Sequence, residues 1–157
     1  MAKARWDGRF RMEDAGQKAY NVQQFQDLVK DIPFAMFTTM NGERGLRSRP
    51  MVASAGAFDG DLWFFTRTSS AVAQELAKNA VVNITYVSAP EDRFISVSGN
   101  ACVVRDVEHA LAMWHPAYNQ WFPGGAADAD LSLIKVEVRR VEYWDRKAGR
   151  MKDLEAR

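Results

Sequence analysis

The sequence predicts a mainly β fold, a six-stranded antiparallel barrel with a few short flanking helices. Six β-prone stretches follow one another through tight turns, which favours antiparallel pairing. The chain has 157 residues, 47% of them apolar and 26% charged, which suits one soluble domain with a sizeable core. A flat sheet of six antiparallel strands leaves two edges open, and closure into a barrel removes them.

The elements follow from local patterns taken in chain order. A first helix is expected over residues 19–31, where apolar residues recur at helical spacing between an N-cap at Asn21 and a stop at Pro33. The six strands are expected at residues 34–40, 46–58, 62–66, 80–89, 93–104 and 131–145. Two further helices are expected at 70–79 and 106–114, before an aromatic loop over 115–130. We therefore expect a single domain over 1–157, with the barrel core at about 20–145 and polar tails at both ends.

Composition excludes several classes of protein. One cysteine and two histidines leave no disulfide framework and almost no scope for a Cys/His zinc cage. A formal net charge of +1 argues against a nucleic-acid binder. The chain shows no secretory signal and no apolar run long enough to span a membrane, so a cytoplasmic location is expected. A nearly neutral chain with few catalytic groups often takes its chemistry from a cofactor.

Two arginines on one predicted strand give the first functional signal. Alternate strand residues share a face, so Arg47, Arg49 and Met51 point the same way. Two guanidinium groups at this spacing form a fork suited to a phosphate. Pro50 between them lacks a ladder donor, which marks an edge, a bulge or a backbone that faces a ligand. The alternative is a pair of solvent-exposed arginines on the barrel rim.

Ser69 and Ser70 stand where a strand ends and a helix begins. Hydroxyl groups and free backbone N–H groups at a helix start form an anion site. A plain N-cap explains the same residues equally well. Beside the Arg47 and Arg49 strand, however, these serines favour an organic phosphate as the ligand.

Aromatic residues form the third signal, because flat rings beside a phosphate clamp suit a planar heterocycle. Trp114 lies at helical spacing and fits a core position, whereas Trp121 and Trp144 are harder to assign to a core. These two tryptophans could equally anchor a dimer interface. On the strand at 62–66, alternation places one aromatic pair inside the barrel without deciding which.

Five motifs occur in an order typical of one known family. They are FTTMNGERGLRSRPM, DLWFFTRTSSAVAQEL, NAVVNITYVS, WFPGG and VEYWD, within residues 20–145. The ordered set resembles the pyridoxamine 5'-phosphate oxidase-like split-barrel proteins that bind FMN, and within them the bacterial general stress proteins. The resemblance implies a six-stranded antiparallel split β-barrel and a homodimer with the flavin, FMN or alternatively FAD, at the subunit interface.

The resemblance also implies site residues. Arg49 would contact the FMN phosphate together with Ser69 and Ser70, and Arg47 and Ser48 would flank that contact. The remaining residues would lie along the flavin ring or the ribityl chain, with Trp144 reaching it from the second subunit: Pro50, Met51, Phe65, Thr66, Trp121 and Trp144.

Two differences from the family pattern limit the functions that the resemblance implies. Val72 stands where the family commonly has a phosphate-binding lysine. The tail after Trp144 has no histidine, which argues against pyridoxamine phosphate oxidation. The leading hypothesis is an FMN-binding general stress protein, and the sequence leaves open whether it is a flavin-dependent oxidoreductase or a non-catalytic flavin carrier. A single-strand nucleic-acid module is the third hypothesis.

Overall fold

The structure is a computed structural model that describes residues 20–53 and 60–155. The strands are β1 (Phe34–Met40), β2 (Leu46–Val52), β3 (Leu62–Arg67), β4 (Val81–Ser88), β5 (Arg93–Val104), β6 (Leu131–Asp145) and β7 (Arg150–Asp153). The helices are α1 (Val22–Val29), α2 (Ala71–Lys78) and α3 (Val107–Met113). The expected strand at 46–58 ends at Val52, and residues 54–59 lie outside the described part of the chain.

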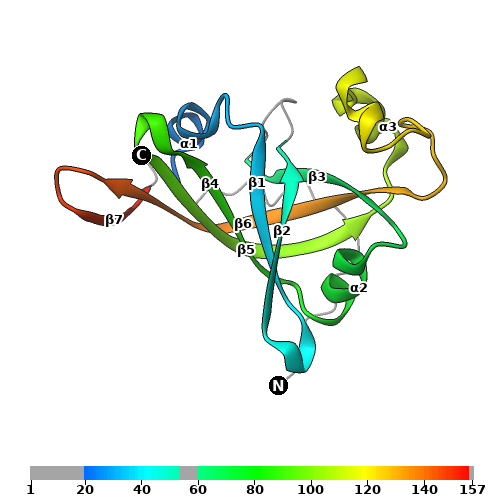
Figure 1. Ribbon diagram of the computed structural model, residues 1–157, viewed down its shortest axis with the longest axis horizontal. Helices are drawn as coiled ribbons and strands as arrows, with labels where there is room; N and C mark the ends of the chain where they lie inside the picture. The colour runs from blue at the N-terminus through cyan, green and yellow to red at the C-terminus, as the bar shows by residue number, and fades with distance from the viewer. Residues whose placement is uncertain (1–19, 54–59, 156–157) are drawn as a thin grey trace, which may run out of the picture.

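All seven strands belong to one antiparallel sheet with the order β2-β1-β4-β5-β6-β3, and β7 is added on β6. Among the described residues, no ladder joins β2 to β3 at the two ends of this path. The barrel is therefore split between these two strands. In Figure 1 the β1–β2 hairpin crosses the long β5 and β6 strands, and α2 and α3 lie toward the right-hand side of the view. The predicted mainly β fold is confirmed.

Each α-helix begins with a side-chain cap that satisfies an N–H group of its first turn. Asn21 accepts from Gln24 at 2.9 Å, Ser70 caps α2, and Asp106 caps α3. The predicted helices are thus confirmed, with bounds shorter by one to a few residues at each end. Short helices of this kind depend on packing against the sheet rather than on propensity alone.

Two hydrophobic clusters lie on opposite faces of β3. Leu62 and Phe64 point into the barrel, where they join a core that includes Phe25, Phe37 and Ile84. The alternate residues of β3 pack outside the barrel under α3 and the aromatic loop, in a cluster that includes Phe65, Trp63, Trp114, Tyr118 and Phe122. The structure thus decides which aromatic pair of β3 is interior, and it confirms Trp114 as a packed residue.

Strand β7 was not anticipated from the sequence, which predicts six strands and a polar C-terminal tail. Its residues pair with the end of β6, from Glu142 opposite Asp153 to Asp145 opposite Arg150. Leu154, which follows β7, is only 4% exposed and belongs to the core inside the barrel. The hydrogen bonds to β6 and the burial of Leu154 therefore stabilise a strand in a segment whose sequence is typical of a solvated tail.

A register shift between Ser98 and Gly99 marks a bulge in the β5–β6 pairing. A Cβ atom on Gly99 would lie 2.3 Å from the carbonyl oxygen of Glu137, so only glycine fits this close approach of two strands. Strand β6 is 15 residues long and continues past this bulge into the β6–β7 hairpin.

None of the helices within residues 20–53 and 60–155 is long and apolar enough to cross a membrane. The same part of the chain holds no group of three or more His, Cys, Asp or Glu residues that could bind a metal ion.

Candidate functional site

The site is built around the first turn of α2, which follows directly from β3. Ser70 accepts the Ala73 N–H at 3.2 Å, and its hydroxyl lies 2.9 Å from that of Thr66 at the end of β3. The N–H groups of Ala71 and Val72 belong to the first turn, where a helix offers no acceptor of its own. This strand end and helix start are the segment in which the sequence predicts a phosphate site.

Arg47 and Arg49 share one face of β2, as their spacing predicts. Their register partners on β1 are Thr39 and Phe37, both fully buried, so this face points into the end of the barrel that α2 covers. Met51 continues the same face and packs against the barrel core. The structure therefore brings both arginines to α2, where the Arg49 side chain is largely buried and the Arg47 side chain stays half exposed.

Glu75, one turn into α2, is the acidic partner of both arginines. Its Oε2 lies 2.6 Å from Arg49 Nη2, and its Oε1 lies 3.2 Å from Arg47 Nη1. Thr39 donates its hydroxyl to Glu75 Oε2 and accepts from Arg49 Nη1 at 2.8 Å. We call Thr39, Arg47, Arg49 and Glu75 the arginine cluster; Glu75 is 8% exposed.

The electrostatics of the arginine cluster keep Glu75 ionised. Burial favours the protonated form, but hydrogen bonds from Thr39 and Arg49 and the charge of Arg49 more than offset it, so the pKa lies below the usual 4.5. Two cations and one anion leave the cluster with one positive charge in excess. An anionic group is the ligand that such a place favours.

Ser69 and Ser70, expected together at the phosphate, have different partners. Ser69 gives its N–H at 3.1 Å and its hydroxyl at 2.7 Å to the two carboxylate oxygens of Asp130. The hydrogen bond from Ser69 holds the pKa of the Asp130 carboxyl below its usual value. Asp130 also accepts the Thr68 N–H through its carbonyl group at 2.7 Å, so it fastens the β3–α2 turn to the start of β6.

Val72, where the family pattern has a lysine, faces the barrel core. It is 5% exposed and packs in the barrel core with Leu76. A charged side chain at this position of α2 would have to leave that core to reach a ligand. Arg67, at the end of β3, donates to the carbonyl group of Trp121 at 3.3 Å and lies over the Phe122 ring, so it does not take the place of that lysine.

Phe65 and Thr66 of β3 are both buried, with Phe65 in the cluster under α3 and Thr66 at the helix cap.

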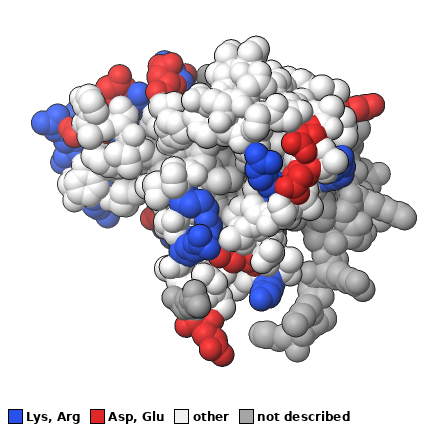
Figure 2. Space-filling model, turned by 45° about the vertical axis from the view of Figure 1, so that its right-hand side comes forward, with Lys and Arg blue, Asp and Glu red and all other residues white. Residues whose placement is uncertain are grey.

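Trp121 is 39% exposed and stacks edge-on against Phe34, with ring centroids 5.9 Å apart. Residues 109–127 contain no Lys, Arg, Asp or Glu. Figure 2, in which the α2 and α3 side comes forward, shows a broad uncharged area with charged side chains gathered at its margins.

Ser48 and Pro50 lie on the outer face of β2, opposite to the arginines. The Ser48 hydroxyl is 2.6 Å from that of Thr38 on β1, and the Pro50 side chain is exposed. Pro50 falls on the strand at the end of the sheet path, where its missing N–H costs no ladder bond. Ser48 therefore does not share a face with the phosphate candidates.

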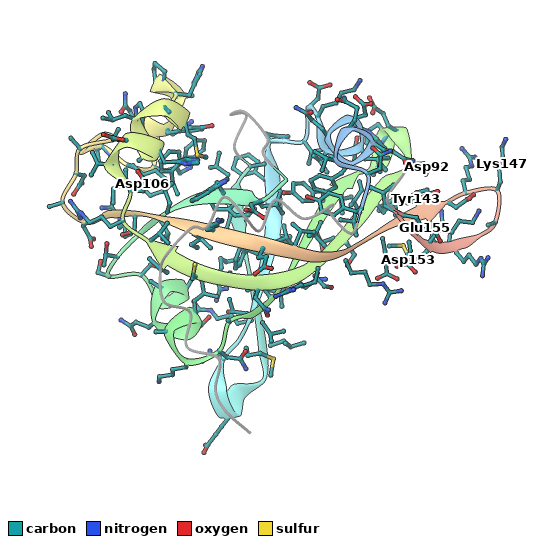
Figure 3. The ribbon with its side chains drawn as sticks, turned by 180° about the vertical axis from the view of Figure 1, so that it is seen from behind. Asp92, Asp106, Tyr143, Lys147, Asp153 and Glu155 are labelled. Atoms are coloured by element: carbon teal, nitrogen blue, oxygen red, sulfur yellow. The ribbon has the colours of Figure 1, made fainter. Side chains whose placement is uncertain are left out.

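Trp144 lies at the far end of β6 from the arginine cluster. The start of β6 pairs with Arg67, just before α2, whereas Trp144 comes 13 residues after that start, opposite Met151 of β7. Figure 3 shows Lys147 at the tip of this hairpin and Tyr143 near its base. Within one chain Trp144 does not reach the cluster, so any joint site needs a second copy.

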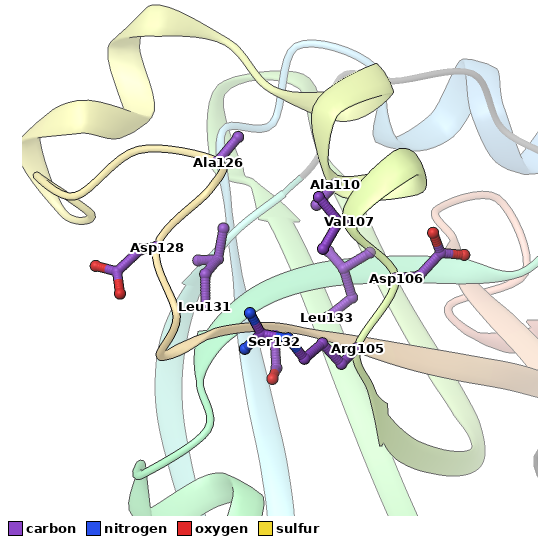
Figure 4. Close-up of a pocket in the computed structure, with 9 residues that line it drawn as sticks. All are labelled: Arg105, Asp106, Val107, Ala110, Ala126, Asp128, Leu131, Ser132 and Leu133. Atoms are coloured by element: carbon purple, nitrogen blue, oxygen red, sulfur yellow. The ribbon is translucent and has the colours of Figure 1, made fainter.

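Two cavities are further candidates for a ligand-binding site. A small pocket of about 10 Å³ lies between α3 and the start of β6, lined by Arg105, Asp106 and Ser132 among others (Figure 4). This volume suits at most one water molecule. A larger cavity of about 660 Å³ lies between the α1–β1 turn, the ends of β2 and β3, and the aromatic loop, and Phe34, Val52 and Trp121 line it.

Sequence reasoning missed Thr39, Glu75 and Asp130. Glu75 carried one usable signal, because it stands three residues after Val72 and beside Leu76, on the apolar face of the predicted helix. Thr39 and Asp130 carry none, since their roles arise from pairing with segments far away in the chain.

The fold and this geometry define an antiparallel split-barrel protein with a basic, hydroxyl-rich side-chain cluster at one end of the barrel. The family described as pyridoxamine 5'-phosphate oxidase like matches residues 20–155, so the chain belongs to that family. The chain is 30% identical over 137 residues to protein bli-3 of Neurospora crassa, covering 81% of this chain and 64% of that protein. It therefore spans less than two thirds of this curated relative.

Solved structures agree with the fold. A protein of Clostridium acetobutylicum related to general stress protein 26 has a TM-score of 0.73 at 16% identity, over 85% of this chain and 93% of its own. A general stress FMN/FAD binding protein of Xanthomonas citri has a TM-score of 0.68 at 27% identity, over 78% and 87%.

Proposed function

We propose that the protein is an FMN-binding member of its family, with the phosphate of the flavin held between β2 and the start of α2. The observation that carries the proposal is the arginine cluster, which brings two guanidinium groups and one excess positive charge to α2 through Glu75. Arg47, with its side chain 51% exposed, offers donors to an incoming anion. The residues present therefore fit a phosphate without the lysine that Val72 replaces. FAD is the alternative flavin.

We further propose that two copies pair through the outer face of β2, β1, β4 and β5. None of the side chains that this face presents is charged: Phe34, Met36, Thr38, Met40, Leu46, Ser48, Pro50, Val52, Val81, Asn83, Thr85, Val87, Phe94, Ser96, Ser98 and Asn100. Leu46 is 71% exposed and Val81 is 56% exposed. Continuous uncharged surface with exposed large apolar side chains is typical of a protein interface.

In such a dimer the flavin ring would lie along the backbone of Pro50 and Met51, on the strand at the end of the sheet path. Trp144 on the projecting hairpin would reach the ring from the second subunit, and Trp121 would lie on the same side as Phe34. These placements rest on the family resemblance together with the distance of Trp144 from the cluster in its own chain. Bound FMN would supply hydride or electron transfer, and this chain would bind and orient it.

A non-catalytic flavin carrier is the second candidate, and the carboxylates of the site favour it. Glu75 and Asp130 both have lowered pKa values and accept hydrogen bonds, so neither is a proton donor at neutral pH. Steady turnover of NADH or NADPH with an electron acceptor by the FMN-loaded protein would decide for an oxidoreductase. Its absence would decide for the carrier.

The test of the proposed function is a titration of the purified protein with FMN, followed by flavin fluorescence. We expect saturable quenching at micromolar protein with one FMN per chain, and a dimer by light scattering. Riboflavin, which has the same ring and no phosphate, is the matched ligand and should bind more weakly. The absence of any change in fluorescence would overturn the flavin proposal. A monomer that binds FMN fully would overturn the interfacial site alone.

A further inference from the structure

The outer face of β2, β1, β4 and β5 carries a row of polar side chains that crosses all four strands. Thr38 of β1 lies opposite Ser48 of β2 and opposite Asn83 of β4, and Asn83 lies opposite Ser98 of β5. Residues directly opposite each other in an antiparallel pair share one face of the sheet. We call Ser48, Thr38, Asn83 and Ser98 the polar row.

Apolar side chains border the polar row in both directions along the strands. The next row on one side is mixed, because Thr85 and Ser96 are polar whereas Met36 and Pro50 are not. On the other side Asn100 lies at the β5 margin of an otherwise apolar row. The bordering apolar side chains are Leu46, Met40 and Val81 toward one end of the strands, and Val52, Phe34, Val87 and Phe94 toward the other.

Hydrogen bonds within the face hold the polar groups in place. The Thr38 and Ser48 hydroxyl groups lie 2.6 Å apart. Asn83 Nδ2 donates to the Ser96 hydroxyl group at 2.9 Å and to that of Ser98 at 3.3 Å. Hydroxyl and amide oxygens each have two acceptor lone pairs, so every member of the polar row can still accept a hydrogen bond from a partner.

This chemistry fits a second copy of the same face. An isologous interface brings one patch of both subunits together, so the patch must complement itself. Ser, Thr and Asn side chains both donate and accept, which meets this condition, whereas side chains of like charge repel each other. None of the described side chains on this face is charged, so a strongly charged partner would find no ion pair there.

We infer that the polar row selects the register in which two copies pair, with the polar row of one copy against that of the other. A shift by one row moves the copies by two residues, or about 7 Å. Several hydroxyl and amide groups would then be buried against apolar side chains without partners. Apolar contacts are not directional and would tolerate the same shift.

The inference rests on the proposed function, because the pairing of two copies is part of that proposal. It adds the reason why the pair would have one arrangement. A fixed register would bring Trp144 of the second copy to one place beside β2, and a slipped register would move it away from the flavin. The polar row would therefore consist of positioning residues for a site that needs both copies.

The test removes the polar groups without adding charge. In the double variant Thr38→Val/Asn83→Leu, we expect a dimer by sedimentation equilibrium but more than one set of peaks in the amide NMR spectrum, because several registers become populated. If about a tenth of the pairs keep the original register, the apparent FMN dissociation constant rises about 10-fold. A purely structural role of the row would not split the peaks.

Matched variants on the same face separate polarity from packing. Met36→Leu changes an apolar side chain of β1 and should keep one set of peaks and the FMN affinity of the unsubstituted protein. Thr38→Ser keeps the hydroxyl group and should behave in the same way. Ser48→Ala/Ser98→Ala removes the two ends of the row with minimal change in volume, and it should split the peaks even if the first double variant does not fold.

The outcomes separate this inference from the proposed function. A monomeric unsubstituted protein overturns the proposed dimer and the inference with it. A dimer that binds FMN, and whose polar-row variants keep one set of peaks and full FMN affinity, retains the proposed function and overturns the role of the polar row. Dissociation of these variants into monomers also overturns that role, because the row would then supply affinity and not register.

Discussion

Two ion-pair networks of similar geometry lie in opposite surroundings. In the arginine cluster, Glu75 bridges Arg47 and Arg49 at 3.2 and 2.6 Å under α2. On the β6–β7 hairpin, Arg140 bridges Asp153 and Glu142 at 2.5 and 3.2 Å, with its side chain 58% exposed. Contact distances alone do not separate these two networks, but burial does.

The two networks differ in the free energy of desolvation that their formation requires. Charges on the hairpin remain hydrated, so pairing them gains little and salt screens it. Arg49 and Glu75 in the arginine cluster lose most of their water, and packed apolar side chains would often stabilise such a place as well or better. Buried charge at the end of the barrel is therefore hard to explain by stability alone, and it is consistent with the phosphate site proposed above.

The largest expected effect comes from removing the buried carboxylate. Glu75→Ala leaves Arg49 and Thr39 without their main partner, which should lower the free energy of unfolding by about 3 kcal/mol. Urea denaturation followed by tryptophan fluorescence measures this. The matched control is Glu137→Ala, which removes an exposed carboxylate paired with Arg139. Equal losses in the two variants would contradict the contrast between the networks.

A smaller effect should appear in the dependence of stability on pH. Hydrogen bonds and the charge of Arg49 lower the folded-state pKa of Glu75 below 4.5 against the effect of burial. A lowered pKa stabilises the fold fully above the unfolded-state value, and this contribution is lost as pH falls through the folded-state value. The stability gap between the unsubstituted protein and Glu75→Gln should thus be widest above about pH 5 and narrow below it. A gap that grows on acidification would show the opposite shift.

The same contrast explains which features of the structure could be predicted from the sequence. Strands such as Phe34–Met40 and Arg93–Val104 were predicted with their observed bounds, because apolar alternation and turn residues are local signals. The face shared by Arg47 and Arg49 also follows from local alternation. Their partner Glu75 does not, because helix spacing shows only that it lies on an apolar face, and the contact joins residues 26 to 28 positions apart.

Strand β7 and Asp130 escaped prediction for related reasons. The residues of β7, RMKD, carry no alternation that distinguishes them from a solvated tail, and their pairing depends on the end of β6. Asp130 lies in a loop, and its contact with Ser69 spans 61 residues. Both features arise from tertiary pairing, which a local pattern cannot encode.

The smallest expected effect belongs to the hairpin network. Asp153→Asn removes the negative charge that pairs with Arg140 Nε and Nη2, yet both side chains are at least half exposed and water compensates for the lost ion pair. We expect no resolvable change in the urea midpoint at 0.5 M NaCl and at most a slight one at low salt, where screening is weak. A large loss at high salt would mean that the hairpin is buried in solution. Since Trp144 and Met151 lie on the same hairpin, that result would place a second copy against it.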